Sequence, residues 1–244
     1  MKISVVCVYN DEKAFQEQLK TSLENQLVEY ELISICNKDK TFSSASSALN
    51  FGAGQATGDV LIFSHQDIFI KGSDQLELLA RAIQEAPEYS VVGTQGIVDK
   101  SKCDVTNITA GQDYNSSEIH NYEYKLYEVS TFDEGLFGMK KSTWERHKFD
   151  EKICDNWHLY AIEQCLYARS HAGRVYVYPI QFHHYSMGTI SLSYMNTLKE
   201  LCRIYRKDFK YIWTTCYKVR TNPIYINILV KIWLLNRIIR GRSY

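Results

Sequence analysis

The 244-residue sequence has no C-x-x-C pair and no excess of either charge. Its seven cysteines are scattered and odd in number, so neither a disulfide framework nor a structural zinc site is predicted. Basic and acidic residues number 28 each, and the chain therefore lacks the broad positive charge with which proteins bind nucleic acid. We expect no nucleic-acid partner, and the cysteine usage fits a reducing cytoplasm.

The sequence predicts neither an export signal nor a linker. The first apolar run, residues 3–9, is short, and no small-residue cleavage site follows it. No stretch has the composition of a linker, and 45% of residues are hydrophobic against 23% charged, which supports a substantial core. We expect one domain over residues 1–195 and a C-terminal helical extension over residues 196–244.

Buried-type strands alternate with amphipathic helices along the chain. Apolar, β-branched runs at residues 3–9 and 30–37 are typical of strands buried on both faces of a sheet. Between them, Phe15, Leu19 and Leu23 lie four residues apart and predict one helical face. Further strands are predicted at residues 59–67, 89–98 and 174–180, and helices at 73–87 and 156–173. This order predicts an α/β fold with a Rossmann-like mixed, mostly parallel sheet flanked by helices.

Polar residues follow three of these strands at the point where each strand ends. Asn10 follows the first, Asn37 the second and Asp67 the third. Open α/β sheets bind ligands beyond the carboxyl ends of their strands, so we expect a functional site at this edge. Asp67, which follows His65 and Gln66, is a candidate cation ligand, and capping of a turn is the alternative.

Two adjacent histidines, His183 and His184, end the last predicted strand. A single histidine is usually a packed core residue, but a pair at a strand end can present one imidazole to a metal or a diphosphate. We select His184 for this role. Trp157 and Tyr185 are candidates for stacking on a sugar or a base, with ordinary packing as the alternative.

Three segments together resemble the nucleotide-sugar-dependent glycosyltransferases of the family 2 type, which have the GT-A fold. They are SVVCVYND, NFGAGQATGDVLIFSHQD and FDEKICDNWHLYAIEQCLYARSHAGRVYVYP, and the likeness extends over residues 3–190. It is closest to the branch in which HQD replaces D-x-D. The resemblance implies inverting transfer of a sugar from a nucleotide-sugar donor to a glycan or lipid-linked acceptor, as in surface polysaccharide synthesis.

The resemblance implies a donor site at the strand ends. In it, Tyr9, Asn10 and Asp11 border the base and ribose, and Asn37 stands where many members carry an aspartate that contacts the base. The other residues expected near the donor are Asn50, Gly52, Gln66 and Trp157. Loose glycine spacing is a weak signal, so the glycines of this segment could equally be turn or helix-end residues.

The resemblance also implies a divalent cation, Mn²⁺ or Mg²⁺, with Asp67 and His184 as ligands. Such a cation stabilises the negative charge of a leaving nucleoside diphosphate. Magnesium and manganese keep water and phosphate ligands, so one carboxylate with a histidine can suffice. His65 stands where other members carry a carboxylate.

An inverting transferase needs a carboxylate that accepts the proton of the acceptor hydroxyl. Family members often carry a Glu-Asp pair at the start of the acceptor-side helix, and here Tyr160 and Ala161 replace it. We expect Glu163 to act as the base, with Asp155 as the second choice and His158 between them. A surface or capping role is the alternative for each carboxylate.

The C-terminal segment, residues 222–244, is strongly apolar but is interrupted by Lys231, Asn236, Arg237 and Arg240. A lysine near its middle argues against a membrane-spanning helix. Its apolar bulk and terminal arginines favour a helix that lies on the inner face of the cell membrane. Packing on the domain, or on a second copy in a homo-oligomer, is the alternative.

Two other functions stay open at this stage. The missing Glu-Asp pair and the histidine at position 65 favour a nucleotide- or glycan-binding protein that has the same fold but no activity. A nucleotidyltransferase shares the parallel sheet and metal-assisted phosphate chemistry. However, no glycine-rich loop followed by a basic residue lies near the N-terminus.

Overall fold

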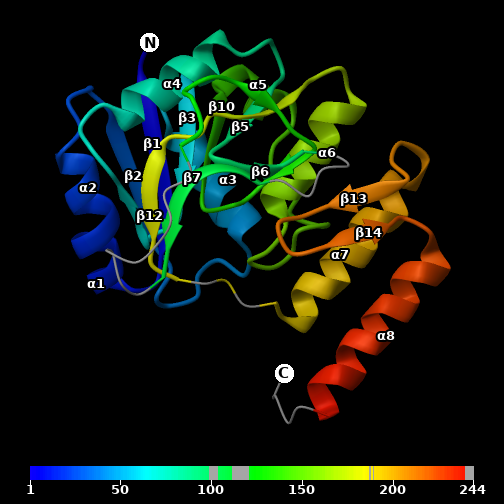
Figure 1. The fold of residues 1–244 in the computed structure, drawn as a ribbon. Coiled ribbons are helices and arrows are strands. Elements are labelled where there is room, and N and C mark those ends of the chain that lie inside the picture. Colours follow the sequence, from blue (N-terminus) through cyan, green and yellow to red (C-terminus); the bar gives the residue numbers. More distant parts are fainter. Residues whose placement is uncertain (99–103, 112–120, 187, 189, 240–244) are drawn as a thin grey trace.

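The computed structural model describes residues 1–98, 104–111, 121–186, 188 and 190–239, and Figure 1 shows a central sheet with helices on both faces. The strands of this sheet are β1 (Ile3–Tyr9), β2 (Glu31–Cys36), β3 (Val60–Ser64), β5 (Val91–Gly93), β8 (Tyr127–Glu128), β10 (Leu136–Lys140) and β11 (Val175–Val177). Their order is β2-β1-β3-β10-β5-β11-β8. Strands β10 and β8 run antiparallel to their neighbours and the other pairings are parallel, which confirms the mixed, mostly parallel sheet.

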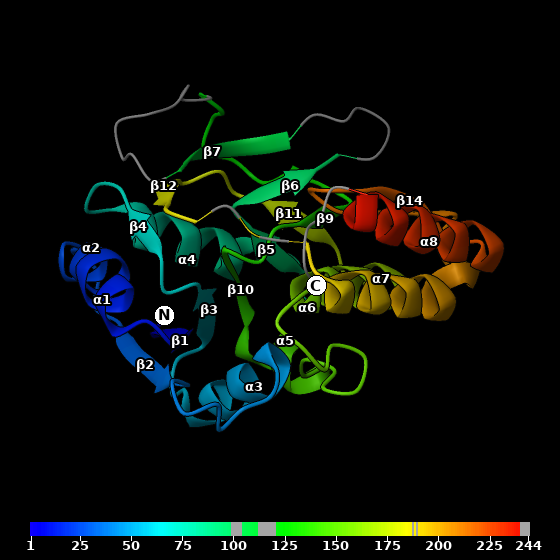
Figure 2. The same cartoon turned by 90° about the horizontal axis from the view of Figure 1, so that it is seen from below.

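A smaller sheet lies beside the central one (Figure 2). Its strands are β4 (Ile68–Ile70), β6 (Gln95–Ile97), β7 (Asp104–Ala110), β9 (Thr131–Phe132) and β12 (Gln181–His184), in the order β4-β12-β7-β6-β9. Strand β4 begins directly after Asp67 and pairs with β12, so that His184 lies opposite Ile68. The second sheet thus places the end of β12 beside the loop that follows β3.

Helices pack on both faces of the central sheet. One face carries α1 (Glu12–Ala14), a π-helical turn (Phe15–Lys20), α2 (Thr21–Glu24) and α4 (Gln75–Glu85). The other face carries α3 (Ala45–Gln55), α5 (Lys141–Arg146) and α6 (Tyr160–Ser170). Phe15, Leu19 and Leu23 are all buried, as their four-residue spacing predicted.

The chain ends in a helical unit that packs against α6. It comprises α7 (Leu192–Ile204), a 3₁₀ turn (Tyr205–Lys207), β13 (Tyr211–Trp213), β14 (Lys218–Arg220) and α8 (Pro223–Ile239). Leu198 and Leu201 of α7 share an apolar core with Leu159 and Leu166. The boundary expected after residue 195 lies within α7. Over the described ranges, no helix combines the length and the hydropathy that crossing a bilayer requires.

Candidate active site

Two loops meet at the carboxyl edge of the central sheet. Strands β1, β2 and β3 end there, and antiparallel β10 begins there, because Ser64 at the end of β3 pairs with Leu136 at the start of β10. The N–H of His65 donates to the carbonyl of Gly135 at 2.9 Å. The loop that carries His65 and Asp67 therefore lies against the loop that carries Glu134.

His65, Asp67 and His184 form a compact cluster at this edge. One candidate ligand atom from each side chain lies within 4.8 Å of the other two. The pairing of β4 with β12 brings His184 to Asp67, whose Oδ1 lies 3.4 Å from His184 Nε2. The side chains of His184 and Asp67 are 17% and 15% exposed, so the cluster is enclosed but accessible. The structure thus brings the two expected metal ligands together and adds His65 as a third.

The charges in this cluster favour a bound cation. Burial by itself would raise the pKa of Asp67, but hydrogen bonds and attraction from His184 hold that pKa well below its usual range. Burial acts to lower the pKa of His184, and the Asp67 carboxylate more than reverses this, so the pKa of His184 is raised. Burial and the neighbouring His184 lower the pKa of His65. Asp67 is consequently ionised at neutral pH and His65 is neutral, the forms in which both bind a metal.

The donor set fits a divalent cation. Carboxylate oxygen suits Mg²⁺ and Mn²⁺, and imidazole nitrogen suits transition metals, so one aspartate with two histidines favours Mn²⁺. Three protein ligands leave coordination positions for substrate phosphate and water. The hydroxyl of Tyr160 lies 3.0 Å from His65 Nε2, and a partner of this kind orients a ligand ring.

Mn²⁺ affinity should fall as the pH is lowered, because protons compete with the cation for His184. Its pKa is raised, so its ring takes up a proton at a higher pH than an ordinary histidine does. Below that pKa, displacement of one proton weakens the apparent affinity about 10-fold per pH unit. Calorimetric titration with Mn²⁺ from about pH 5.5 to about pH 8 measures this dependence. An affinity that is constant over this range would contradict a histidine ligand.

A cavity of about 400 Å³ opens beside the cluster. His65 and His184 line it on the side of the cluster, and Trp157, His158 and Tyr194 contribute aromatic rings. Burial lowers the pKa of His158, which favours the neutral ring. A larger open groove of about 680 Å³ lies at the opposite edge of the sheet and contains none of these residues. The cavity beside the cluster is therefore the candidate active-site cavity.

Two adjacent carboxylates, Asp133 and Glu134, also line the cavity, and neither was predicted from the sequence. Asp133 is fully engaged, since its Oδ1 accepts the N–H of Gly135 at 3.0 Å and its Oδ2 accepts the hydroxyl of Thr215 at 3.1 Å. Glu134 Oε1 is enclosed and has no hydrogen-bond partner among the described residues. Burial and the charge of Asp133 raise the pKa of Glu134 well above its usual value.

Helix α6 begins at the Glu134 carboxylate. The backbone N–H groups of Leu159 and Tyr160 donate to it and oppose part of the rise in its pKa. Leu159 has a left-handed backbone with φ 65°, which costs about 1 kcal/mol for a residue with a Cβ. Such strain persists where the surrounding structure holds it, and it concentrates at functional sites. The strained turn therefore lies against Glu134, whose Oε1 has no hydrogen-bond partner among the described residues.

Gln66 joins the cation loop to the loop after β1. Its Oε1 accepts the N–H groups of Asn10 at 2.8 Å and Asp11 at 3.0 Å. Its Nε2 donates to Asn10 Oδ1 at 3.0 Å. Asn10 and Asp11 are exposed, and Tyr9 directly precedes them at the end of β1. The structure thus brings four of the expected donor residues to the same edge as Asp67.

Asn37 and Asn50 have structural partners that occupy their side chains. The amide of Asn37 donates to the carbonyl of Phe42 at 3.1 Å and accepts its N–H at 2.8 Å, which closes the loop after β2. The amide of Asn50 donates to the Phe149 carbonyl at 2.9 Å, and its oxygen accepts the Trp144 indole N–H at 3.2 Å. Asn37 is 5% exposed, and the Asn50 side chain also bonds to Glu151 and to the Phe149 N–H, so both side chains hold the protein's own loops in place.

Gly52 lies within α3 and not in a phosphate-binding loop. A Cβ at this position would lie 2.6 Å from Val6 Cγ1 and 2.8 Å from Ile35 Cδ1. The missing side chain therefore allows α3 to pack closely on β1 and β2. This packing accounts for the glycine, and the contact with a donor stays a prediction.

Glu163, the residue expected to act as the base, is buried away from the cavity. It is 1% exposed, its Oε1 accepts the hydroxyl of Tyr205 at 2.7 Å, and its Oε2 lies 3.0 Å from His147 Nε2. Asp155 is exposed, accepts a hydrogen bond from the Asn156 side chain at 3.1 Å and does not line the cavity. Of the three catalytic candidates, the structure brings only His158 to the cavity.

Replacing Glu163 by Ala should destabilise the fold by about 3 kcal/mol, because it leaves the buried Tyr205 hydroxyl and His147 ring without their partner. Urea unfolding followed by circular dichroism measures the change. Asp155→Ala is the matched control, and its exposed position predicts a change within about 0.5 kcal/mol. A Glu163→Ala protein of full stability that has lost activity would restore the catalytic interpretation.

The mostly parallel sheet flanked by helices, with a His-Asp-His cluster and a carboxylate-lined cavity at its carboxyl edge, is an α/β fold of the GT-A type. The chain belongs to the family described as "glycosyltransferase like family", whose model matches residues 4–207. No curated protein matches the chain in sequence.

Solved structures agree with this fold. GalNAc-T7, in a crystal structure with UDP, GalNAc and Mn²⁺, is similar with a TM-score of 0.59 at 15% identity, over 84% of this chain and 48% of that one. Residues 1–349 of S. aureus TarS, in complex with UDP-GlcNAc, are similar with a TM-score of 0.57 at 16% identity, over 88% of this chain and 69% of that one. The chain thus spans about half the length of the GalNAc-T7 chain. At these identities the likeness concerns the fold alone.

Proposed function

We propose that the protein transfers a sugar from a nucleoside-diphosphate donor to an acceptor hydroxyl, with inversion at the anomeric carbon. The cluster of His65, Asp67 and His184 beside a carboxylate-lined cavity carries this proposal. Membership of a glycosyltransferase-like family supports the reaction class. The UDP, UDP-GlcNAc and Mn²⁺ in the similar solved structures support the classes of donor and cofactor.

Two neighbouring loops would hold two parts of the donor, its diphosphate and its nucleoside. His65, Asp67 and His184 would hold Mn²⁺ or Mg²⁺, which when bound stabilises the negative charge of the leaving diphosphate. The exposed loop of Asn10 and Asp11 borders the nucleoside. Because Gln66 bonds to this loop from within the cation loop, the nucleoside and diphosphate sites keep a fixed separation.

We assign the general base to Glu134 in place of Glu163. The acceptor oxygen bonds to the anomeric carbon as the bond from that carbon to the diphosphate breaks, and the hydroxyl proton passes to the carboxylate. Glu134 has an unpaired oxygen and a raised pKa, which makes its ionised form a stronger base than an ordinary carboxylate. Asp133 is the second choice, because its two oxygens already accept hydrogen bonds.

The acceptor occupies the part of the cavity lined by Trp157, Ile162 and Tyr194. Aromatic rings stack on the apolar faces of sugars, and Ile162 adds apolar contact. This lining supports a glycan or lipid-linked acceptor, as in the synthesis of surface polysaccharides. The hydroxyl of Thr215, which also lines the cavity, would bond to a hydroxyl of the acceptor.

A panel of nucleotide sugars tests the proposal. At a concentration about 100 times its dissociation constant, the true donor should stabilise the fold by about 2.7 kcal/mol in thermal unfolding, and Mn²⁺ should strengthen the effect. Incubation with that donor and candidate acceptors should release nucleoside diphosphate, and NMR of the product reports the anomeric configuration. Binding without turnover would favour the non-catalytic alternative. No stabilisation by any donor would refute the proposal.

A further inference from the structure

Helix α8 is apolar on two opposite faces. The inner face packs on the C-terminal core through Ile226, Leu229 and Trp233. The outer face consists of large side chains that are 48% to 72% exposed, namely Ile224, Tyr225, Ile228, Ile232, Leu235, Ile238 and Ile239. We call these seven residues the outer stripe. Successive members recur mainly at intervals of three or four residues, which aligns them along one side of the helix.

The outer stripe is too extensive to be incidental. Single exposed hydrophobic residues are normal, but a contiguous row along a helix marks an interaction surface. The 17 residues of α8 extend for about 25 Å at 1.5 Å per residue. A surface that long accommodates an extended partner and not a small ligand.

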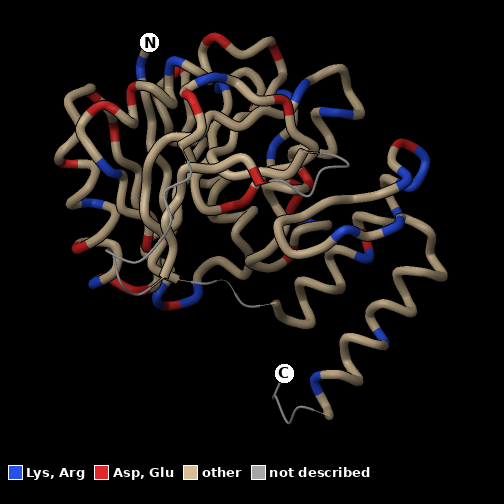
Figure 3. Tube along the Cα trace, viewed as in Figure 1, with Lys and Arg blue, Asp and Glu red and all other residues tan. Residues whose placement is uncertain are grey.

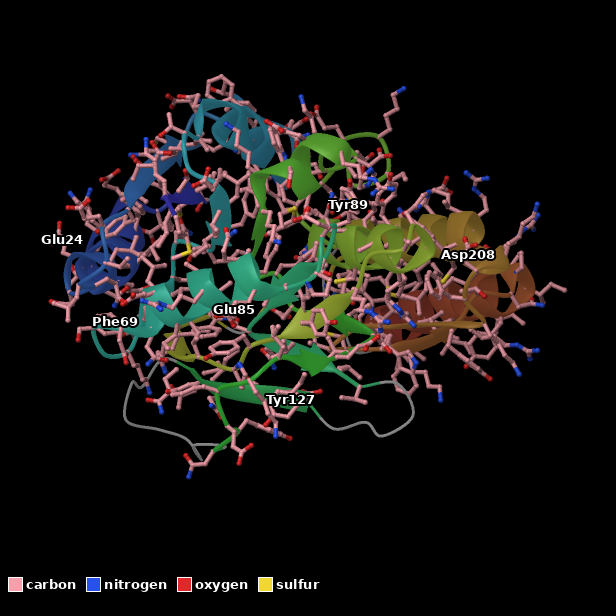
Figure 4. All side chains as sticks on the ribbon, turned by 90° about the horizontal axis from the view of Figure 1, so that it is seen from above. Glu24, Phe69, Glu85, Tyr89, Tyr127 and Asp208 are labelled. Atoms are coloured by element: carbon pink, nitrogen blue, oxygen red, sulfur yellow. The ribbon has the colours of Figure 1, made fainter. Side chains whose placement is uncertain are left out.

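The charge of the chain after Asp208 indicates the chemistry of the partner. No aspartate or glutamate follows Asp208, whereas lysine or arginine occurs seven times after it, at positions 210, 218, 220, 231, 237, 240 and 242. The chain as a whole has no net charge, so this end is basic and the remainder is acidic. Figure 3 shows lysine and arginine without acidic residues along β14 and α8, and Figure 4 shows Asp208 at the end of the molecule remote from Glu24.

Lys231 argues against a second copy as the partner. It is exposed, it lies between Ile228 and Leu235 on the outer side, and it is the midpoint of α8. A two-fold pair of α8 helices in register would set Lys231 against the same residue of the other copy within an apolar contact, where unpaired charge is costly. At a lipid surface the lysine stem lies in the apolar layer and its ammonium group reaches the headgroups.

We propose that α8 docks lengthwise on an anionic phospholipid surface. The outer stripe enters the interfacial layer, Lys231 within it meets the phosphate headgroups, and the basic charge of this end of the chain attracts the anionic surface. Arg237 faces the protein, where it donates to the carbonyl of Ile190 at 3.1 Å. Helix α8 packs on α7, and Tyr194 of α7 lines the cavity. Docking therefore holds the acceptor side of the cavity close to the membrane, although the docking itself does not depend on the reaction.

Vesicle co-sedimentation of the full chain tests the proposal. Binding to phosphatidylcholine vesicles that contain phosphatidylglycerol should be at least about 10-fold tighter than to phosphatidylcholine alone, and it should weaken with added salt. Ile228→Glu with Ile232→Glu should weaken binding about 100-fold, because two apolar contacts with the lipid are lost and two negative charges are added. Gln55→Glu with Gln84→Glu makes the same charge change at exposed positions on α3 and α4, and it should bind within about 2-fold of the wild type.

Three results would overturn the proposal. They are equal binding to vesicles with and without phosphatidylglycerol, no binding to either, and a dimer in sedimentation velocity that the Ile228→Glu, Ile232→Glu variant dissociates. Circular dichroism of that variant checks that it is folded. Thermal stabilisation by UDP with Mn²⁺ should be the same in this variant and the wild type, so a failure of docking is distinguishable from a failure of donor binding.

Discussion

Asn in place of Asp67 should abolish Mn²⁺ binding in calorimetry and lower the rate of sugar transfer by about 1,000-fold or more. Asn has nearly the size and shape of Asp but carries no charge. The lowered pKa shows that the surroundings of Asp67 stabilise its ionised form, and two neutral imidazoles alone would leave the cation without an anionic ligand. The loss corresponds to the several kcal/mol with which a Lewis acid stabilises a leaving diphosphate.

His184 provides a readout of the same substitution that does not require catalysis. The Asp67 carboxylate raises the pKa of His184, so Asp67→Asn should shift its NMR titration to lower pH. Asp155→Asn is the matched control, because this exposed residue lies outside the cavity, and it should retain Mn²⁺ binding and transfer. Wild-type transfer by Asp67→Asn would remove the basis for a cation-dependent mechanism.

The sequence was sufficient to predict the sheet and the edge at which its parallel strands end. Continuous β-branched runs mark strands buried on both faces, and the polar residue that ends each run marks the edge. Asn10 and Asp67 lie at that edge for this reason. The contact of Asp67 with His184 could not be predicted in this way, because it depends on the pairing of β4 with β12 in the second sheet.

The sequence did not indicate which side chains of helix α6 are buried. Eight of its residues are buried, Tyr160 to Leu166 and Ala168, so the helix lacks the polar face that separates solvent from core. Glu163 matches an acidic position in the pattern of the family that the sequence resembles, and nothing nearby in the chain indicates its partners. Its carboxylate meets His147 and Tyr205, which come from other segments.

The base candidate was missed for a topological reason. Strand β10 lies antiparallel between β3 and β5, and only this direction returns Glu134 to the edge where parallel strands end. The available signal was two adjacent carboxylates, Asp133 and Glu134, immediately before a buried apolar run. In contrast, Asn50 and Gly52 were expected near the donor from the family resemblance, and Gly52 here allows α3 to pack closely on β1 and β2.

Glu134→Gln should lower kcat by about 100-fold to 10,000-fold while Mn²⁺ and donor affinities stay close to wild type. Gln can still accept the N–H groups of Leu159 and Tyr160, but it cannot take the proton of the acceptor hydroxyl. Because the pKa of Glu134 is raised, the wild-type rate should increase with pH through a range above that of an ordinary carboxylate, where the base becomes ionised. This rise should be absent from the pH profile of the Gln variant.

Stability and a neighbouring substitution separate a catalytic role of Glu134 from a structural one. Removing a carboxylate that is costly to ionise in its buried site should leave the free energy of unfolding unchanged or higher, so a loss of rate would not reflect unfolding. Asp133→Asn should chiefly raise KM, because it loosens the contacts to Gly135 and Thr215 at the rim of the cavity. If Asp133→Asn abolishes turnover and Glu134→Gln does not, the proton passes to Asp133, and the unpaired oxygen of Glu134 has no part in the reaction.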